Sequence, residues 1–142
     1  MKIYLAAPYS LKYEVSKKAD HLRRLGFIVT SSWLEEPERP DIQLQDLSNK
    51  ERIERAVRNL NDVDAADALV LFSHPDSRGG KHVEFGHARN KIRIVVGPHE
   101  NIFHYLPMVN VVPTWLDAVE ILMEEKNGYH VIQTIHCGDR LD

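Results

Sequence analysis

Apolar residues gather in five short runs that are rich in β-branched side chains. Each run is four to six residues long and is bounded by charged residues, proline or glycine. Continuous apolar runs of this length between turn residues are typical of buried strands. We therefore predict strands at Lys2–Ala7, Phe27–Thr30, Ala68–Phe72, Ile92–Val96 and Val109–Val112, with the most apolar run, Ala68–Phe72, at the centre of the sheet.

The segments between these runs repeat their apolar residues every three or four positions, which indicates amphipathic helices. The first helix is predicted from Leu11 to Leu25, and Gly26 ends it. The second opens at Ser48, which is followed three residues later by Glu51 in a capping-box pattern. Its apolar stripe is Ile53, Ala56, Val57, Leu60 and Val63, and two later helices span Lys81–Asn90 and Trp115 to about Lys126.

Strands that alternate with helices predict a parallel sheet covered on both faces. We expect a single doubly wound α/β domain of the Rossmann or flavodoxin-like type, with about five strands, over residues 1–126. Residues 127–142 form a tail that the pattern does not place. Ligands of such sheets bind beyond the carboxyl ends of the strands, where the strand order reverses. The loops Ala7–Ser10 and Ser73–Gly80 are therefore the expected places for chemistry.

Composition narrows the range of functions. A chain of 142 residues fits one domain, and a net charge of −3 argues against a duplex nucleic-acid binder. A single cysteine, Cys137, excludes an intrachain disulfide and a cysteine-rich zinc site. The sequence has no leader pattern and no apolar run of about 20 residues, so we expect a cytoplasmic protein without a membrane span. We expect no cofactor and no metal, since His82 and His87 are five apart and do not share a helix face.

The stretch from Asp76 to Ala88 carries the candidate chemistry. Gly79 and Gly80 stand at a strand-to-helix turn, where backbone can approach a ligand closely. Glu84 is predicted in the first helical turn, where the helix dipole favours an ionised carboxylate. A carboxylate at the mouth of a pocket can attack an anomeric carbon. On spacing alone, however, a glutamate at a helix start is more often a solvated surface residue.

Three segments together resemble the nucleoside 2-deoxyribosyltransferase family, which includes the deoxynucleoside 5′-monophosphate N-glycosidases. They are Ile3–Pro8, Ala66–Val70 and Gly79–Ala88, and the similarity runs in order from Lys2 to about Leu122. The resemblance implies cleavage or exchange of the N-glycosidic bond of a 2′-deoxynucleoside or its 5′-monophosphate. It also implies a homo-oligomer in which a neighbouring subunit completes the pocket for this small molecule.

The resemblance assigns roles to individual residues. Glu84 matches the nucleophile that takes up the deoxyribosyl group, and Tyr4 matches the tyrosine that orients it. Asn101 matches an asparagine that reaches into the neighbouring subunit's pocket, although a helix N-cap is nearly as common a role for it. The remaining predicted substrate contacts are Ala7, Pro8, Ser10, Ser77, Arg78, Gly79, Gly80 and His82, with Lys12 as a further candidate for phosphate.

Two departures from the family pattern leave questions open. Asn59 stands where the family has an aspartate that helps the base to leave, and an amide cannot shuttle a proton at neutral pH. Asp76 or Asp62 would then supply the proton, or the chain is a catalytically impaired nucleotide-binding or sensing module. Ahead of Glu84, the family's transferases have an aspartate and its monophosphate hydrolases a serine, and this chain has both Asp76 and Ser77. The sequence therefore does not decide whether the reaction is transfer or hydrolysis, or whether the substrate is a nucleoside or a 5′-monophosphate.

Overall fold

The computed structural model describes residues 1–36, 47–75 and 78–128. These residues form a five-stranded sheet in which every pair of neighbouring strands is parallel. Along the chain the strands are β1 Lys2–Ala6, β2 Ile28–Val29, β3 Ala68–Phe72, β4 Ile92–Val96 and β5 Val109–Val112. All five predicted strands are confirmed, and the predicted second strand is shortened to two residues.

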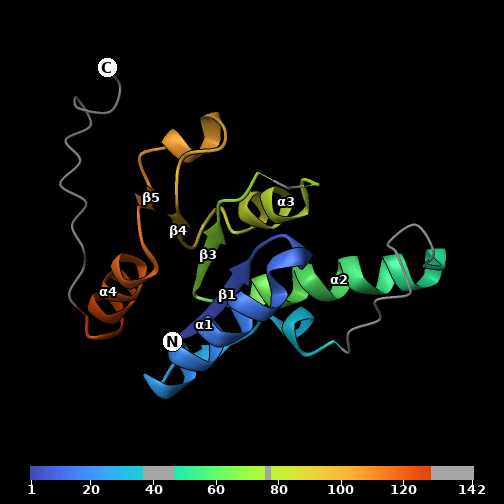
Figure 1. Cartoon of the computed structure of the whole chain (residues 1–142), viewed down its shortest axis with the longest axis horizontal. Coiled ribbons are helices and arrows are strands. Elements are labelled where there is room, and N and C mark those ends of the chain that lie inside the picture. Colours follow the sequence, from blue (N-terminus) through green and yellow to red (C-terminus); the bar gives the residue numbers. More distant parts are fainter. Residues whose placement is uncertain (37–46, 76–77, 129–142) are drawn as a thin grey trace.

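In the described part of the chain, four α-helices cover the two faces of the sheet (Figure 1). They are α1 Lys12–Arg24, α2 Asn49–Ala65, α3 Gly80–His87 and α4 Trp115–Lys126. One face carries α1 and α4, joined by bonds such as that from Trp115 Nε1 to His21 Nδ1 at 2.9 Å. The other face carries α2 and α3, which pack on each other. None of the helices in the described ranges is long and apolar enough to cross a membrane.

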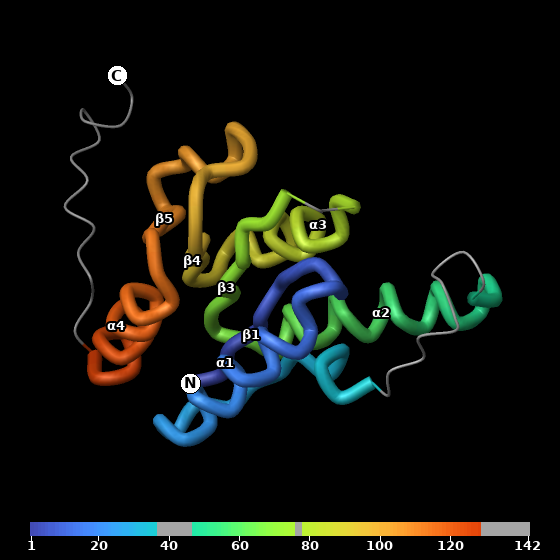
Figure 2. Tube along the Cα trace, viewed as in Figure 1, coloured from blue at the N-terminus to red at the C-terminus, as the bar shows by residue number. Residues whose placement is uncertain are grey.

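The strand order is β2-β1-β3-β4-β5. Successive strands are therefore added toward one edge on the β1 side and toward the other edge from β3 onward, and the strand order reverses between β1 and β3. From β1 the chain crosses through α1 to one edge, and from β3 it crosses through α3 toward the other edge, as the trace in Figure 2 shows. The doubly wound fold predicted from the sequence is confirmed. The carboxyl ends of β1 and β3 lie side by side at this reversal, since Ala6 pairs with Leu71.

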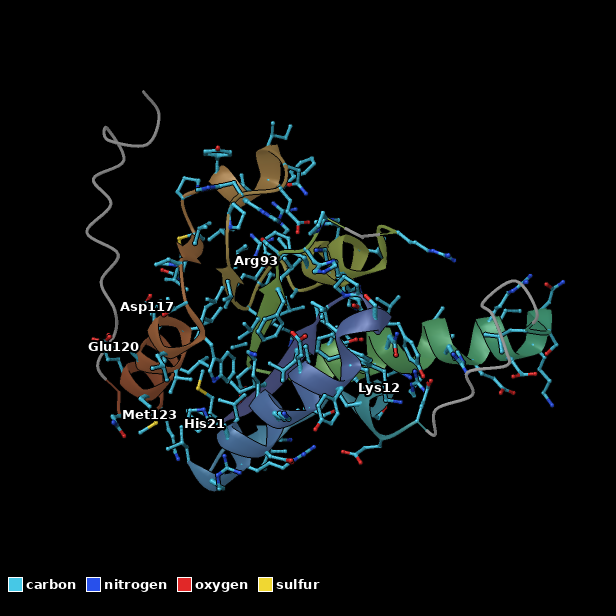
Figure 3. The ribbon with its side chains drawn as sticks, in the orientation of Figure 1. Lys12, His21, Arg93, Asp117, Glu120 and Met123 are labelled. Carbon is cyan, nitrogen blue, oxygen red and sulfur yellow. The ribbon has the colours of Figure 1, made fainter. Side chains whose placement is uncertain are left out.

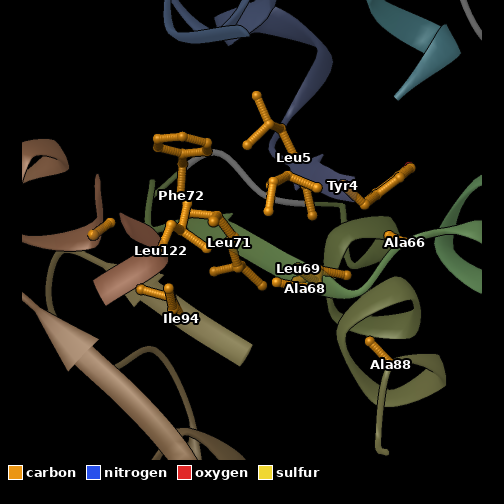
Figure 4. Packing of buried hydrophobic residues seen from close by; sticks show 14 of the residues in the cluster. Tyr4, Leu5, Ala66, Ala68, Leu69, Leu71, Phe72, Ala88, Ile94 and Leu122 are labelled. Atoms are coloured by element: carbon orange, nitrogen blue, oxygen red, sulfur yellow. The ribbon is translucent and has the colours of Figure 1, made fainter. Parts of the chain in front are cut away.

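The core lies on both sides of the central strand β3, whose five residues are all buried (Figure 4). Leu5 and Leu71 are completely buried, and so is Tyr4, which extends from β1 toward α3. Successive side chains along a strand point to opposite faces of the sheet. Tyr4 is therefore directed to the α3 face, while Ile3 and Leu5 fill the opposite layer.

Helix α2 begins as the sequence predicts, because the Ser48 hydroxyl accepts a hydrogen bond from the backbone N–H of Glu51 at 3.1 Å. Its apolar stripe differs from the expectation. Val63 is fully buried, whereas Ile53 and Val57 are 63% and 53% exposed. The amino-terminal half of α2 extends beyond the sheet (Figure 1), so these side chains have no strand to pack on.

Candidate functional site

Tyr4 and Glu84 form a buried pair between the sheet and α3. The Tyr4 hydroxyl donates to Glu84 Oε2 at 2.5 Å, across 80 positions of sequence. Tyr4 is 0% exposed and Glu84 is 9% exposed. The strand position of Tyr4 and the helix position of Glu84 thus bring together the two residues that the family resemblance singled out.

The predicted place of Glu84 in the first helical turn is wrong. Helix α3 begins at Gly80, one residue earlier than predicted, after Gly79 adopts a left-handed conformation with φ of 91°. Glu84 is consequently the fifth helical residue, and no acidic residue lies in the first turn. The dipole and the free N–H groups act within that first turn, so they do not account for the state of this carboxylate.

Burial dominates the electrostatics of the pair. It raises the pKa of Glu84 to about 7, although the Tyr4 hydrogen bond, the Arg58 charge and an Asn59 hydrogen bond act in the opposite direction. The pKa of Tyr4 is also raised, first by burial and then by the negative charge of Glu84. Burial therefore opposes the ionisation of Glu84 that the helix dipole was expected to favour, because the desolvation of a buried acid favours its neutral form.

Asn59, on α2, is the third member of the site. Its amide lies near enough to Glu84 to lower the pKa of that carboxyl. The Asn59 Oδ1 atom accepts from Arg58 Nε at 3.3 Å and from an Arg58 terminal nitrogen at 2.9 Å. Since the guanidinium occupies the oxygen, the amide nitrogen is left to donate to the carboxylate. Arg58 thereby sets the orientation of the group that touches Glu84.

Asp62 lies one helical turn further along α2. Its Oδ2 atom accepts hydrogen bonds from the Ser32 backbone N–H at 3.1 Å and from the Ser32 hydroxyl at 2.5 Å. Its negative charge raises the pKa of both Tyr4 and Glu84. Of the two acids that the sequence offers in place of the family's aspartate, Asp62 lies beside the pair, and Asp76 falls outside the described residues.

The loop after β1 supplies the next group of predicted contacts. Ala7 and Pro8 are half-buried directly beyond the strand, and Ser10 is exposed in the short 3-10 helix η1, Tyr9–Leu11. Lys12 is not a free loop cation. It is buried, it donates to the Glu36 carbonyl, and its ammonium lies 5.1 Å from the centre of the Tyr9 ring.

The loop after β3 is described in part. Ser77, like Asp76, lies outside the described residues, and Arg78 is exposed just before Gly79. A Cβ built on Gly79 or Gly80 meets no atom within 4 Å, so open space adjoins both glycines. This agrees with the expectation that backbone is accessible to a ligand at this turn.

His82 and Asn101 meet at a second cluster, centred on Glu100. Glu100 Oε2 contacts His82 Nε2 at 2.9 Å, and Glu100 Oε1 accepts from Lys81 Nζ at 2.6 Å. Burial opposes ionisation of Glu100, but the bonds from Lys81 and from the His74 backbone outweigh it, so its pKa lies below the ordinary value. The side chain of Lys81 is 1% exposed. This ion pair ties the β4–β5 loop to α3.

Within its own chain, Asn101 has the helix-capping role that the sequence also allowed. Its Oδ1 atom accepts from the Phe103 backbone N–H at 2.9 Å and caps the 3-10 helix η4, Ile102–Tyr105. Its amide nitrogen lies 3.3 Å from His82 Nδ1.

Sequence reasoning missed Arg58, Lys81 and Glu100. Each of them occupies a segment in which charged residues are common, and a charge on a helix or in a loop is ordinarily solvated. The spacing of Arg58 next to Asn59 carried no indication that the two side chains bond to each other. Only the packing of α2 against α3 directs Arg58 toward the buried pair.

Comparison of the sequence with family models and with curated proteins finds no match. Solved structures do match. A 2-deoxyribosyltransferase from the psychrotolerant bacterium Bacillus psychrosaccharolyticus superimposes with a TM-score of 0.66 and 22% identity, over 83% of this chain and 90% of that one. The Clostridium botulinum CMP N-glycosidase BcmB gives a TM-score of 0.54 and 13% identity, over 87% and 98% of the two chains. The resemblance to the nucleoside 2-deoxyribosyltransferase family is thereby confirmed at the level of the fold.

Proposed function

We propose that this chain cleaves or exchanges the N-glycosidic bond of a 2′-deoxynucleoside or its 5′-monophosphate, with Glu84 as the nucleophile. The observation that carries the proposal is the buried hydrogen bond from Tyr4 to Glu84, next to the reversal of the strand order. That is where parallel sheets of this kind bind ligands. Structural similarity to a 2-deoxyribosyltransferase and to a CMP N-glycosidase supports the same class of reaction.

The reaction we propose has two steps. Glu84 attacks C1′ and forms a glycosyl ester, while the electron pair of the C1′–N bond leaves with the base, which takes up a proton. Water then attacks C1′, releases the sugar and returns the carboxylate, or a second base attacks and forms a new nucleoside. Because Asn59 cannot donate that proton to the base, we assign the step to Asp62 or Asp76.

The surroundings of Glu84 suit a carboxylate that must change its charge during turnover. A group with a pKa near the operating pH shifts easily between its neutral and ionised forms. The Tyr4 hydroxyl, which donates to Glu84, and the Asn59 amide both stabilise the ionised form, since each lowers the pKa of Glu84. Only the ionised form can attack C1′, so we expect activity to rise with pH through about 7.

The substrate panel that tests this proposal contains deoxynucleosides, their 5′-monophosphates and CMP, each with and without a second free base. Free base alone means hydrolysis, and a new nucleoside means transfer. Glu84→Gln should abolish either product, whereas Glu124→Gln, a change of the same kind on α4, should leave the rate unchanged. Rapid quenching should show one deoxyribosyl unit added to the wild-type protein at Glu84. Glu84→Gln turnover above a few per cent of wild type would remove Glu84 as the nucleophile.

The alternative function is a nucleotide-binding module without turnover, and Asn59 is the observation that favours it. An amide in place of an ionisable group would keep a ligand bound but would not help the base to leave. Calorimetry that shows saturable binding of a nucleotide, together with no product after prolonged incubation, would select this alternative.

We also propose that the protein assembles as a homo-oligomer in which a neighbouring subunit, through Asn101, completes the substrate pocket. The exposed apolar side chains of α2 and α3 support this assembly: Ile53 and Val57 lie on α2, and Val83, which is 64% exposed, lies on the adjacent α3. Exposed apolar side chains on neighbouring helices can associate with a second subunit.

A further inference from the structure

A second cavity lies on the side of α3 away from the buried pair. Its volume is about 640 Å³, and it opens between α3 and the loop that joins β4 to β5. Phe103, Leu106 and Met108 of that loop form an apolar wall, and neither Tyr4 nor Glu84 lines the cavity. The volume falls within the range of about 300–1,000 Å³ that is typical of small-molecule sites.

Arg93 of β4, labelled in Figure 3, lines this cavity. It is nearly inaccessible, with 6% exposure. One terminal nitrogen makes a long contact of 3.4 Å with the Phe85 carbonyl, and the guanidinium lies 4.5 Å from the centre of the Phe85 ring. Its Nε atom is buried and has no hydrogen-bond partner among the described residues. Across the described ranges, no carboxylate forms an ion pair with Arg93.

Arg89, just after the end of α3, lines the same cavity. Burial lowers the pKa of Arg93, and the positive charge of Arg89 lowers it further. Arg89 likewise has no carboxylate partner among the residues that the structure describes. A buried cation without a counter-charge is costly, and a second cation beside it adds to that cost. An anion in the cavity would offset both.

Gly86 keeps the floor of the cavity open. It is the last residue but one of α3 and lines the cavity, and a Cβ built on it meets no atom of the described residues within 4 Å. The open space beside Gly86 belongs to the same cavity as the two arginines.

We propose that this cavity is a binding site for a small organic anion, a carboxylate or phosphate monoester carried on an apolar group. The anionic head pairs with Arg89 and Arg93, and the apolar body packs against Phe103, Leu106 and Met108. Guanidinium groups recognise carboxylates and phosphates through paired, charge-assisted hydrogen bonds. The catalytic pair Tyr4 and Glu84 does not line this cavity, whereas His82 and Asn101, two of the predicted substrate contacts, lie at its edge.

The probes are hexanoate and hexyl phosphate, titrated into the full-length protein by calorimetry. Hexanol, which lacks the charge, and acetate, which lacks the apolar body, are the matched ligands. We expect saturable binding of hexanoate or hexyl phosphate with one site per chain. Hexanol and acetate should each bind at least about tenfold more weakly, since a charge-assisted contact contributes roughly one order of magnitude in affinity.

Two variants locate the site, and a third is the control. Arg89→Gln removes the more exposed cation and should weaken binding by about tenfold. Gly86→Leu fills the cavity from the helix side and should abolish binding while the fold is kept, because leucine favours the helix more than glycine does. Arg24→Gln removes an exposed charge at the end of α1, on the opposite face of the sheet, and should have no effect.

Binding that is unchanged in both Arg89→Gln and Gly86→Leu would overturn the proposal, and so would the absence of saturable binding. The anion could also be a carboxylate on a second copy of this chain. Sedimentation with and without hexanoate distinguishes this source from a small molecule. If hexanoate binds only as it dissociates a dimer, the natural occupant is the second copy and the small-molecule proposal is wrong. If it binds without changing the sedimentation coefficient, the proposal stands.

Discussion

At the scale of single residues, the buried carboxyl group of Glu84 beside Tyr4 lowers the stability of the folded chain as the pH rises. A carboxylate whose pKa is about 7 in the folded chain and 4.5 as a free side chain binds its proton more tightly when folded. Between these two values the native state therefore holds more protons than the unfolded state, and stability falls as the pH rises. One pKa unit corresponds to about 1.4 kcal/mol, so the loss reaches about 3 kcal/mol at most above pH 7.

Glu84→Gln should consequently stabilise the protein at pH 8 while it removes activity. The amide of glutamine has no charge to desolvate, and it occupies the same volume. We expect the melting temperature of the variant to exceed that of the wild type by several degrees at pH 8 and by little at pH 4. Thermal unfolding followed by circular dichroism at both values measures this. Equal melting temperatures at pH 8 would mean that burial does not raise the pKa of Glu84.

Tyr4→Phe tests the other half of the pair. The hydroxyl donates to Glu84 and so lowers its pKa, which burial would otherwise raise further. Without it, the rising limb of activity against pH should move above about 7, and kcat/KM at pH 7 should fall about 10- to 100-fold, as expected for a lost contact to a charged group. Tyr13→Phe, on an exposed residue of α1, is the control. A lower rate with an unmoved pH profile would contradict this role.

At the scale of elements, α2 determines the environment of the carboxylate. Arg55 and Arg58 are neighbours on this helix, and both form ion pairs with Glu36. Of the two, Arg58 also bonds to Asn59 and lowers the pKa of Glu84 by its charge. A comparison of variants of the two arginines therefore separates the ion pair with Glu36, which both form, from the effect on Asn59 and Glu84, which only Arg58 has.

Arg58→Gln should reduce kcat more than it raises KM and should move the rising limb of the pH profile to higher pH. Two causes act together: a positive charge is lost, and Asn59 is released to turn its oxygen toward Glu84. Arg55→Gln should leave the profile in place, since it removes only the pairing with Glu36. Identical profiles for the two variants would show that Arg58 is structural and does not position Asn59.

At the scale of the whole molecule, the ion pair between Lys81 and Glu100 joins three separate segments. Lys81 Nζ also donates to the Phe72 carbonyl at 3.0 Å, and Glu100 Oε1 accepts from the His74 backbone N–H at 2.6 Å. The end of β3, the first turn of α3 and the β4–β5 loop thus meet at one buried charge pair. That loop carries Asn101 and the apolar wall of the second cavity.

Glu100→Gln should destabilise the fold by about 3–5 kcal/mol, because it leaves the buried Lys81 ammonium without a counter-charge. Glu100 has a lower pKa in the folded chain than as a free side chain. Its ionised form therefore stabilises the fold at pH values above the pKa of the unfolded chain, and this stabilisation is lost as the pH falls through the folded pKa. Urea unfolding at pH 7 and at pH 3 measures both effects. A variant as stable as the wild type at pH 7 would show that the pair contributes no net stability.

The proposed oligomer is testable through the exposed residues of α2. Ile53→Lys combined with Val57→Lys should shift the sedimentation coefficient to that of a monomer and lower activity at dilute concentrations. Both side chains are exposed in the isolated chain, so we expect the fold to be retained. Leu116→Lys, a comparable exposed change on α4, is the control. A wild-type protein that sediments as a monomer at all concentrations would refute the assembly.

The sequence by itself determined the elements and their arrangement. Runs such as Ala68–Phe72 and the capping pattern of Ser48 are local, and the energies that form them depend on neighbouring residues. Their alternation then leaves a parallel sheet as the arrangement that buries both faces, and the resemblance around Glu84 identified the Tyr4–Glu84 pair. The start of α3 was misjudged by a single residue, yet this moved Glu84 out of the helix's first turn.

Only the tertiary structure decided how these groups behave. The raised pKa of Glu84 arises from burial between α3 and the sheet, and burial depends on which faces meet. The orientation of Asn59 comes from Arg58 and is meaningful only because α2 packs against α3. The exposure of Ile53 on a stripe that periodicity predicted to be buried has the same origin, because a helical pattern identifies an apolar face but not where the sheet beneath it ends.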